Sequence, residues 1–209
     1  MADTFSPLSQ GIIDGDVSTV LDELQKVLDG GTKPQDVMDR YLIPAMEEVG
    51  KRFEEQEFFV PELMIAARAM QEAMKVLDPL LKSSGVQKIG RVVIGTVEGD
   101  FHDIGKNLVA SMLEGGGFEV VDRGVNVSPD TFVEEVKKQD GTILCLSALL
   151  TTTMPQMKKV VEALTTQGLR SKTKVLVGGA PVTAEFAKQI GADGYSDNAS
   201  AAVALAKSL

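Results

Sequence analysis

The residues best suited to chemistry in this sequence lie in one stretch, GTVEGDFHDIGKN, at residues 95–107. This stretch contains His102, the only histidine of the chain, and Asp100 two residues before it. A neutral imidazole is a common metal ligand, and a carboxylate at its second nitrogen fixes the tautomer and raises the basicity of the ligand. We therefore predict that His102 binds a metal and that Asp100 accepts a hydrogen bond from its other ring nitrogen.

Three further features could serve the same ligand. Ser147 ends the apolar run TILCLS, and its hydroxyl could extend a relay from His102 through Asp100. Gly178 and Gly179 end the run KVLVGG and would leave bare backbone against which a bulky group can lie. Gly105 would let the chain pass close to the ligand as a helix begins. An ordinary loop histidine beside an ordinary glycine turn is the alternative interpretation.

The elements that must position these residues alternate in type after residue 89. Apolar, β-branched runs predict strands that start at Arg91, Phe118, Thr142, Lys174 and, for a short last strand, Gly194. Helical segments are expected near 104–115, 129–138, 153–167, 183–190 and 198–208. This pattern predicts an α/β domain at 89–209, with a Rossmann-like or flavodoxin-like parallel sheet of five strands. Such sheets bind ligands at the carboxyl ends of their strands, which is where His102 falls.

Residues 1–86 show only helical patterns. Asp16 can cap a helix that ends near Asp29, and a proline-initiated helix follows at Pro34. A third helix begins at Pro61, and its apolar residues recur at steps of three and four: Leu63, Ala67, Met70, Met74, Leu77 and Leu81. With a weaker helix near 5–13, this half is predicted to be a four-helix bundle. A polar linker at 83–90 follows it.

Composition narrows the function classes. The net charge of −9 argues against a nucleic-acid partner. No apolar run approaches the roughly 20 residues that a membrane span needs, and the N-terminus lacks the features of a secretory signal. Cys145, the only cysteine, lies in an apolar run and is expected to be a buried thiol. These observations predict a cytoplasmic protein without a membrane partner.

The motifs D-x-H-x-x-G (Asp100, His102, Gly105), S-x-L (Ser147, Leu149) and G-G (Gly178, Gly179) resemble a known domain. It is the cobalamin-binding domain of methionine synthase, of the B12-dependent mutases and of corrinoid methyl carriers. The string GDFHDIGKN is similar to the methionine synthase and corrinoid-carrier version, and the helical half resembles the bundle that caps the cofactor there. The resemblance implies a bound cobalamin or related corrinoid, in its methylcobalamin form, with His102 as the lower axial ligand of cobalt.

The resemblance also implies contacts to the cofactor. The expected set is Gly99, Asp100, Phe101, Asp103, Ile104, Gly105, Ser147, Leu149, Thr151, Gly178, Gly179, Ala180 and Ala199, the last beside Asn198. On the methyl side the helical half would offer Phe58, Phe59, Leu63, Met64 and Met70, with burial in the bundle core as the alternative for Leu63 and Met70. The linker at 83–90 is the expected hinge for opening the cap.

The function implied is that of a corrinoid protein, not catalytic alone, which carries a methyl group between two methyltransferases. One would be specific for the donor, and the other would act on a thiol or a tetrahydropterin; a reductive activase is a further candidate partner. The methyl donor (methylamine, methanol, betaine, aryl ether or methyl thiol), the lower base of the native corrinoid and the oligomeric state stay open. Three alternative functions compete with this one. A mutase subunit as a rule lacks the bundle, and a cobalamin-dependent sensor usually has a tryptophan and a basic DNA-binding segment. The third is a flavodoxin-like signalling or nucleotide-binding module.

Overall fold

The computed structural model describes residues 5–83 and 88–209 and divides the chain into two compact units. The first consists of Met1–Lys88 with Glu114–Gly117, and the second of Ile89–Leu113 with Phe118–Leu209. The predicted hinge at 83–90 includes residues 84–87, which lie outside the described residues. Within the described ranges, no helix combines the length and the apolar character that a membrane crossing requires. The cytoplasmic location stays a prediction.

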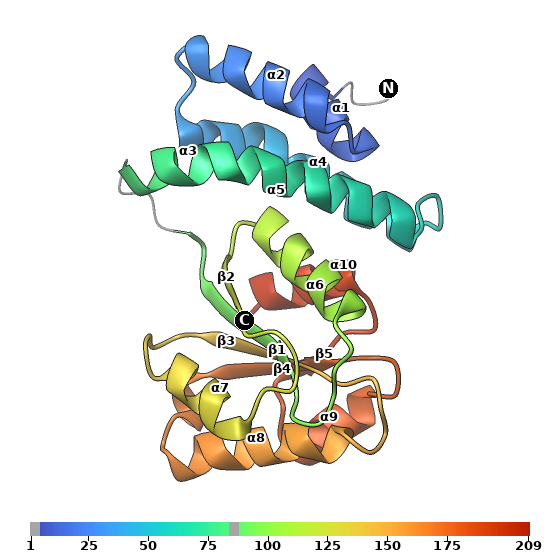
Figure 1. The fold of residues 1–209 in the computed structure, drawn as a ribbon, viewed down its shortest axis with the longest axis vertical. Helices are drawn as coiled ribbons and strands as arrows, with labels where there is room; N and C mark the ends of the chain where they lie inside the picture. Colours follow the sequence, from blue (N-terminus) through green and yellow to red (C-terminus); the bar gives the residue numbers. More distant parts are fainter. Residues whose placement is uncertain (1–4, 84–87) are drawn as a thin grey trace. The chain divides into compact units, whose positions relative to one another are not determined.

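The first unit is helical, as predicted (Figure 1). Its helices are α1 (Pro7–Asp14), α2 (Val17–Asp29), α3 (Pro34–Val37), α4 (Ile43–Glu54) and α5 (Val60–Ser83). Asp16 caps α2 by accepting a hydrogen bond from the Thr19 amide at 3.2 Å. A π-helical turn at Met38–Leu42 joins α3 to α4, and there Ile43 donates to the Met38 carbonyl. Pro44 has no amide hydrogen for the carbonyl four residues earlier, which accounts for the wider turn.

The second unit contains five parallel strands in the order β2-β1-β3-β4-β5. They are β1 (Arg91–Thr96), β2 (Glu119–Asp122), β3 (Ile143–Ser147), β4 (Lys174–Gly178) and β5 (Gly194–Tyr195). Every residue of β1 is buried, which explains the apolar run of Val92, Val93 and Ile94 at its centre. The predicted Rossmann-like or flavodoxin-like sheet is therefore confirmed.

Helices cover both faces of this sheet (Figure 1). One face packs against α6 (Ile104–Gly115) and α10 (Ala199–Lys207), and the other against α7 (Pro129–Val136), α8 (Met154–Thr166) and α9 (Ala184–Ile190). Phe132 of α7 is fully buried beneath β1, and a Cβ atom on Gly95 would approach its ring to 2.8 Å. Glycine is thus required at the next-to-last position of this strand.

A buried ion pair stabilises this unit. Arg91 at the start of β1 pairs with Glu135 of α7 at 3.2 Å, and Lys138 and Arg123 also contact the Glu135 carboxylate. The hydrogen bond from Lys138 outweighs the opposing effect of burial and, with the nearby guanidinium groups, lowers the pKa of Glu135.

Cys145 is buried in the sheet, and burial raises the pKa of its thiol to about 12. The predicted buried thiol is confirmed.

Candidate functional site

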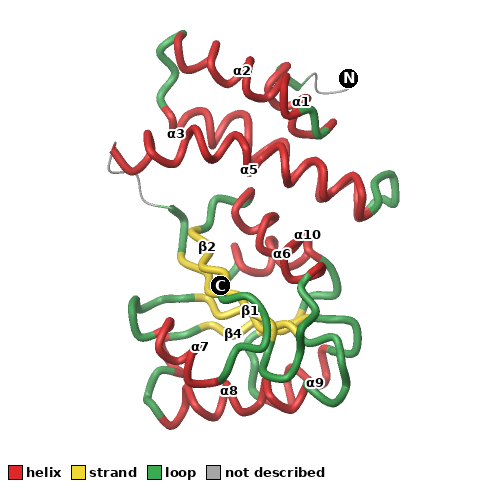
Figure 2. The backbone as a smooth tube through the Cα atoms, in the orientation of Figure 1, coloured by secondary structure: helices red, strands yellow, loops and turns green. Residues whose placement is uncertain are grey.

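The loop between β1 and α6, residues 97–103, lies at the carboxyl edge of the sheet (loops are green in Figure 2). The Asp100 amide donates to the Val97 carbonyl at 3.1 Å, and Gly99 adopts a left-handed conformation with φ +80°. The tight turn directs the Asp100 side chain inward, where it is fully buried. The Thr96 hydroxyl fixes the end of the loop by donating to the His102 carbonyl at 2.8 Å.

His102 and Asp100 form the predicted pair. Nδ1 of His102 lies 2.7 Å from Oδ1 of Asp100, and the His102 amide donates to the same oxygen at 3.1 Å. Because an ionised carboxylate only accepts, it selects the tautomer of the neutral imidazole in which Nδ1 carries the proton and Nε2 keeps its lone pair. The side chain of His102 is 51% exposed, and Nε2 makes no hydrogen bond within the described residues. Nε2 is therefore available to a metal.

The second oxygen of Asp100 is held from the loop after β3. Oδ2 accepts hydrogen bonds from the amides of Leu149 at 2.8 Å and Leu150 at 3.3 Å, and from the Thr153 hydroxyl at 2.7 Å. Burial favours the neutral acid, but the hydrogen bonds from Thr153, His102 and Leu149 hold the pKa of Asp100 well below its usual range. The pair thus rests on an anionic carboxylate at neutral pH.

The predicted relay from Asp100 to Ser147 is wrong, because Thr153 contacts the carboxylate instead. Ser147 is still part of the parallel ladder, where it pairs with Thr96 and Gly178. The chain then turns through Leu149 and Leu150 and brings the residue before α8 over Asp100. Ser147 as a contact to a cofactor stays a prediction.

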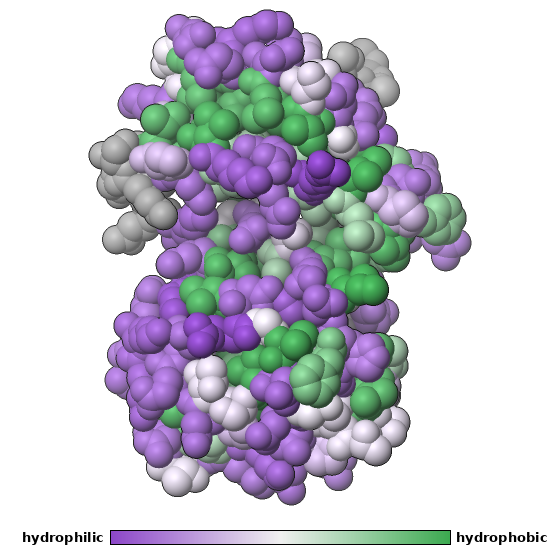
Figure 3. Space-filling view, in the orientation of Figure 1, coloured by the Kyte–Doolittle hydropathy of each residue, from purple (hydrophilic) through white to green (hydrophobic). Residues whose placement is uncertain are grey.

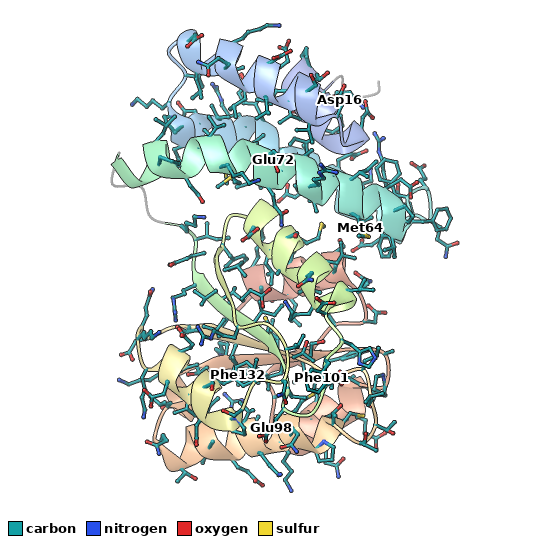
Figure 4. The ribbon with its side chains drawn as sticks, in the orientation of Figure 1. Asp16, Met64, Glu72, Glu98, Phe101 and Phe132 are labelled. Atoms are coloured by element: carbon teal, nitrogen blue, oxygen red, sulfur yellow. The ribbon has the colours of Figure 1, made fainter. Side chains whose placement is uncertain are left out.

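Exposed apolar side chains occur on the β1–α6 segment that contains His102 and on the β3–α8 loop that holds Asp100. Phe101 is 68% exposed and Ile104 is 72% exposed, and Leu149 and Leu150 are exposed as well. Figure 4 labels Phe101 and Glu98, which belong to the β1–α6 loop, and Figure 3 shows hydrophobic side chains on the visible surface in that region. A Cβ atom on Gly105 would meet nothing within 4 Å, so space is open beside the first turn of α6. This surface suits a large, mainly apolar group.

The diglycine lies at the end of β4. Gly179 has φ +125°, and a Cβ atom there would come 1.9 Å from the Ala148 carbonyl oxygen, so no other residue fits. The remaining predicted residues lie on the same edge: Asp103 on the β1–α6 loop, Thr151 after β3, Ala180 after β4 and Ala199 at the start of α10. Ala199 is buried and the other three are exposed. The structure thus brings the predicted set to one edge of the sheet.

Comparison with known proteins assigns the family. Residues 90–204 match a family model described as a B12 binding domain, and residues 5–78 match a second model with the same description. The chain belongs to the B12-binding corrinoid proteins. It is 44% identical over 203 residues to the dimethylamine corrinoid protein of Methanosarcina barkeri, which covers 97% of this chain and 95% of that one.

Two solved structures share the architecture of this corrinoid protein. A cobalamin-binding protein from Desulfitobacterium hafniense DCB-2 matches with a TM-score of 0.80 and 34% identity, over 96% of both chains. The methanol:cobalamin methyltransferase complex MtaBC from Methanosarcina barkeri contains a chain that matches with a TM-score of 0.84 and 32% identity, over 97% of this chain and 77% of that one. The cofactor of the family is cobalamin or a related corrinoid, which brings cobalt.

The residues of the α/β unit fit such a cofactor. Nε2 of His102 offers a lone pair to cobalt, and the apolar surface around it suits the macrocycle. Asp100 is a buried anion without a Lys or Arg partner among the described residues, and such a charge is usually balanced by a cation nearby. A cobalt ion reached through the imidazole would supply that positive charge.

The helical unit of this corrinoid protein was predicted to contact the methyl side. Phe59 and Met64 are more than half exposed at the start of α5. The guanidinium of Arg52 lies over the ring of Phe58, with its Cζ atom 5.3 Å from the ring centroid. Leu63 and Met70 are fully buried, so of the two alternatives for these residues, burial and not contact with a ligand is the one that holds. Their three-and-four spacing already indicated the buried face of the helix.

Proposed function

We propose that this protein carries a methyl group on the cobalt of a bound corrinoid between two methyltransferases, with His102 as the lower axial ligand. One observation carries the proposal: Nδ1–H of the only histidine is held by a buried carboxylate, and Nε2 has no hydrogen-bond partner among residues 5–83 and 88–209 at the ligand-binding edge of the sheet. When bound, the corrinoid supplies a cobalt centre that accepts and releases methyl groups. The protein holds the imidazole tautomer and orientation that this centre needs.

The relatives support a role in a system of several components. The dimethylamine corrinoid protein is named for a methyl donor, and the MtaBC structure is named as a complex with methyltransferase activity towards methanol. We therefore propose a donor-specific methyltransferase as the first partner. A second methyltransferase, acting on a thiol or a tetrahydropterin, completes the proposed cycle, and a reductive activase is a further proposed partner.

The axial ligand can be tested by isotope labelling, because one histidine makes the label specific to one residue. The protein is produced in cells supplied with 15N-histidine, purified and reconstituted with cobalamin. The cobalt is then reduced to its paramagnetic cobalt(II) state. If Nε2 ligates cobalt, the nitrogen hyperfine splitting in the electron paramagnetic resonance spectrum changes from the 14N triplet to the 15N doublet. A 14N triplet that persists in the labelled wild type would refute this ligation, whereas His102→Ala, which has no histidine to label, should still retain part of the corrinoid.

The carrier role needs a separate measurement. Protein reconstituted with methylcobalamin is mixed with a purified thiol-specific or tetrahydropterin-specific corrinoid methyltransferase, and methylated acceptor is counted per cobalt. One acceptor should be methylated to near stoichiometry, faster by the wild type than by His102→Ala. Failure to retain any corrinoid through gel filtration, or retention without transfer to either acceptor class, would refute the proposed function.

A further inference from the structure

The loop between β2 and α7 contains a residue that contacts the histidine loop by both its backbone and its side chain. Oδ1 of Asn126 accepts a hydrogen bond from the Gly99 amide at 2.8 Å. The Asn126 amide donates to the Asp100 carbonyl at 2.9 Å. Asn126 therefore clamps the two residues that form the turn before His102.

The conformation of Asn126 makes this double contact feasible. Its φ is +53°, in the left-handed region that non-glycine residues seldom adopt and that asparagine tolerates better than most. Alanine would be strained there, and glycine would fit but lacks the side-chain oxygen. Asparagine thus combines the backbone geometry of the loop with an acceptor for the Gly99 amide.

The β2–α7 loop is itself anchored, so it can act as a support. The buried Lys106 ammonium pairs with one carboxylate oxygen of Asp122, and the other oxygen accepts from the Gly124 amide at 2.8 Å. The Gly124 carbonyl accepts from Thr96 at 2.9 Å, and the Val127 amide donates to the Thr96 carbonyl at 2.9 Å. Asn126 lies between these fixed points.

The histidine loop is consequently held from two sides. The β3–α8 loop holds the Asp100 carboxylate, whereas Asn126 holds the backbone on either side of that residue. A shift of the backbone would change the angle at which Asp100 meets His102, even with the carboxylate contacts intact. Small displacements of a ligand from its productive geometry weaken metal binding.

We propose that Asn126 is a positioning residue that sets how strongly His102 ligates the corrinoid cobalt. This inference rests on the proposed axial role of His102. The measured quantity is the ratio of histidine-bound to histidine-free cobalt, from the 15N hyperfine signal and from the visible absorption of the methylcobalamin form. A second readout on the protein without cofactor is hydrogen exchange of the Gly99 amide, which loses its acceptor when the side chain is removed.

Three variants isolate the side-chain oxygen. Asn126→Gly keeps the left-handed backbone and removes the acceptor, so we expect faster Gly99 exchange and a roughly fivefold lower ratio, the effect of about one hydrogen bond. Asn126→Asp restores an acceptor and should return the ratio to within about twofold of the wild type. Ser128→Ala is the matched control: Ser128 lies in the same loop and caps α7 through Thr131, so its loss lowers the melting temperature and leaves the ratio unchanged.

The outcomes separate this inference from the proposed function. If the labelled wild type shows no 15N coupling to cobalt, the axial role fails and the inference fails with it. If the labelled wild type shows the coupling but Asn126→Gly retains the wild-type ratio, the inference alone is overturned. It is also overturned if Asn126→Asp does not restore the ratio, or if Ser128→Ala lowers it equally.

Discussion

Asp100→Asn gives the sharpest test of the site, because it changes one carboxylate oxygen into a nitrogen with little change of shape. The wild-type carboxylate accepts two hydrogen bonds at Oδ1, both from His102, and three at Oδ2. An amide offers a single acceptor oxygen. Turning that oxygen towards Leu149, Leu150 and Thr153 keeps three bonds and places the amide NH₂ against His102.

The expected magnitude follows from this orientation. Two hydrogen bonds to a charged acceptor are lost, each worth about 1.5–3 kcal/mol, and one neutral bond of about 1 kcal/mol can form in return. It forms only if Nδ1 of His102 becomes the acceptor, which moves the ring proton to Nε2. A protonated Nε2 has no lone pair for cobalt, so the ratio of histidine-bound to histidine-free cobalt should fall at least about tenfold, or 1.4 kcal/mol.

Two measurements check this prediction. In 15N-histidine-labelled protein without cofactor, the single imidazole should change from the Nδ1–H to the Nε2–H tautomer. In the reconstituted protein, the hyperfine and absorption spectra should approach those of His102→Ala. Glu98→Gln removes the same charge from an exposed position on the same loop and serves as the control. An Asp100→Asn protein that keeps the Nδ1–H tautomer, or the wild-type spectra, would refute the reasoning.

Three further predictions concern single positions in the α/β unit. Gly105→Ala adds a Cβ atom to α6 at a point where no other atom lies within 4 Å. It should stabilise the cofactor-free protein by about 0.5–1 kcal/mol and weaken corrinoid binding. Unchanged corrinoid affinity in equilibrium dialysis would show that the cofactor does not lie against Gly105. Gly179→Ala, with its Cβ 1.9 Å from the Ala148 oxygen, should cost more than about 3 kcal/mol in urea unfolding, and a loss below about 1 kcal/mol would contradict the structure. Glu135→Gln should cost about 3 kcal/mol at neutral pH. Because the pKa of Glu135 in the folded protein is below its ordinary value, the difference in unfolding free energy between wild type and variant should be complete above about pH 5.5 and vanish as the pH falls through the folded pKa. The control is Asp140→Asn, which removes an exposed ion pair and should change the unfolding free energy little at any pH.

The sequence was sufficient to predict most of the fold, for a physical reason. Strands covered on both faces consist of continuous apolar residues, so β1, β3 and β4 stand out against the amphipathic helices between them. The predicted cap Asp16 does cap α2, and Asn198, which was not predicted to be a cap, caps α10. His102 and Asp100 could be paired because two residues of one short loop at a strand end have few alternative partners.

Contacts between distant segments could not be predicted in this way. Three threonines in a row occupy 151–153, and only the path of the turn before α8 decides that Thr153 contacts Asp100. Asn126 lies between two β-branched valines, and although asparagine tolerates the left-handed region, its type alone does not indicate that this residue adopts it or contacts the histidine loop. For Leu63 and Met70 the spacing indicated burial, whereas the resemblance to a capping bundle suggested contact with a ligand. The structure agrees with the spacing, because both side chains are fully buried.

The buried charge of Asp100 links these contacts to the chemistry. A carboxylate fully shielded from water is stable only if its lone pairs are satisfied, and here neutral donors from three loop positions and the imidazole satisfy them. Neutral donors leave the net negative charge uncompensated, so the field of Asp100 acts on the imidazole and increases electron density at Nε2. A Lys or Arg in place of Thr153 would neutralise that charge and make His102 a weaker ligand. The Thr153 hydroxyl and the two backbone amides therefore hold the Asp100 carboxylate in place without neutralising its charge. That charge then acts through the imidazole on the metal ligand Nε2.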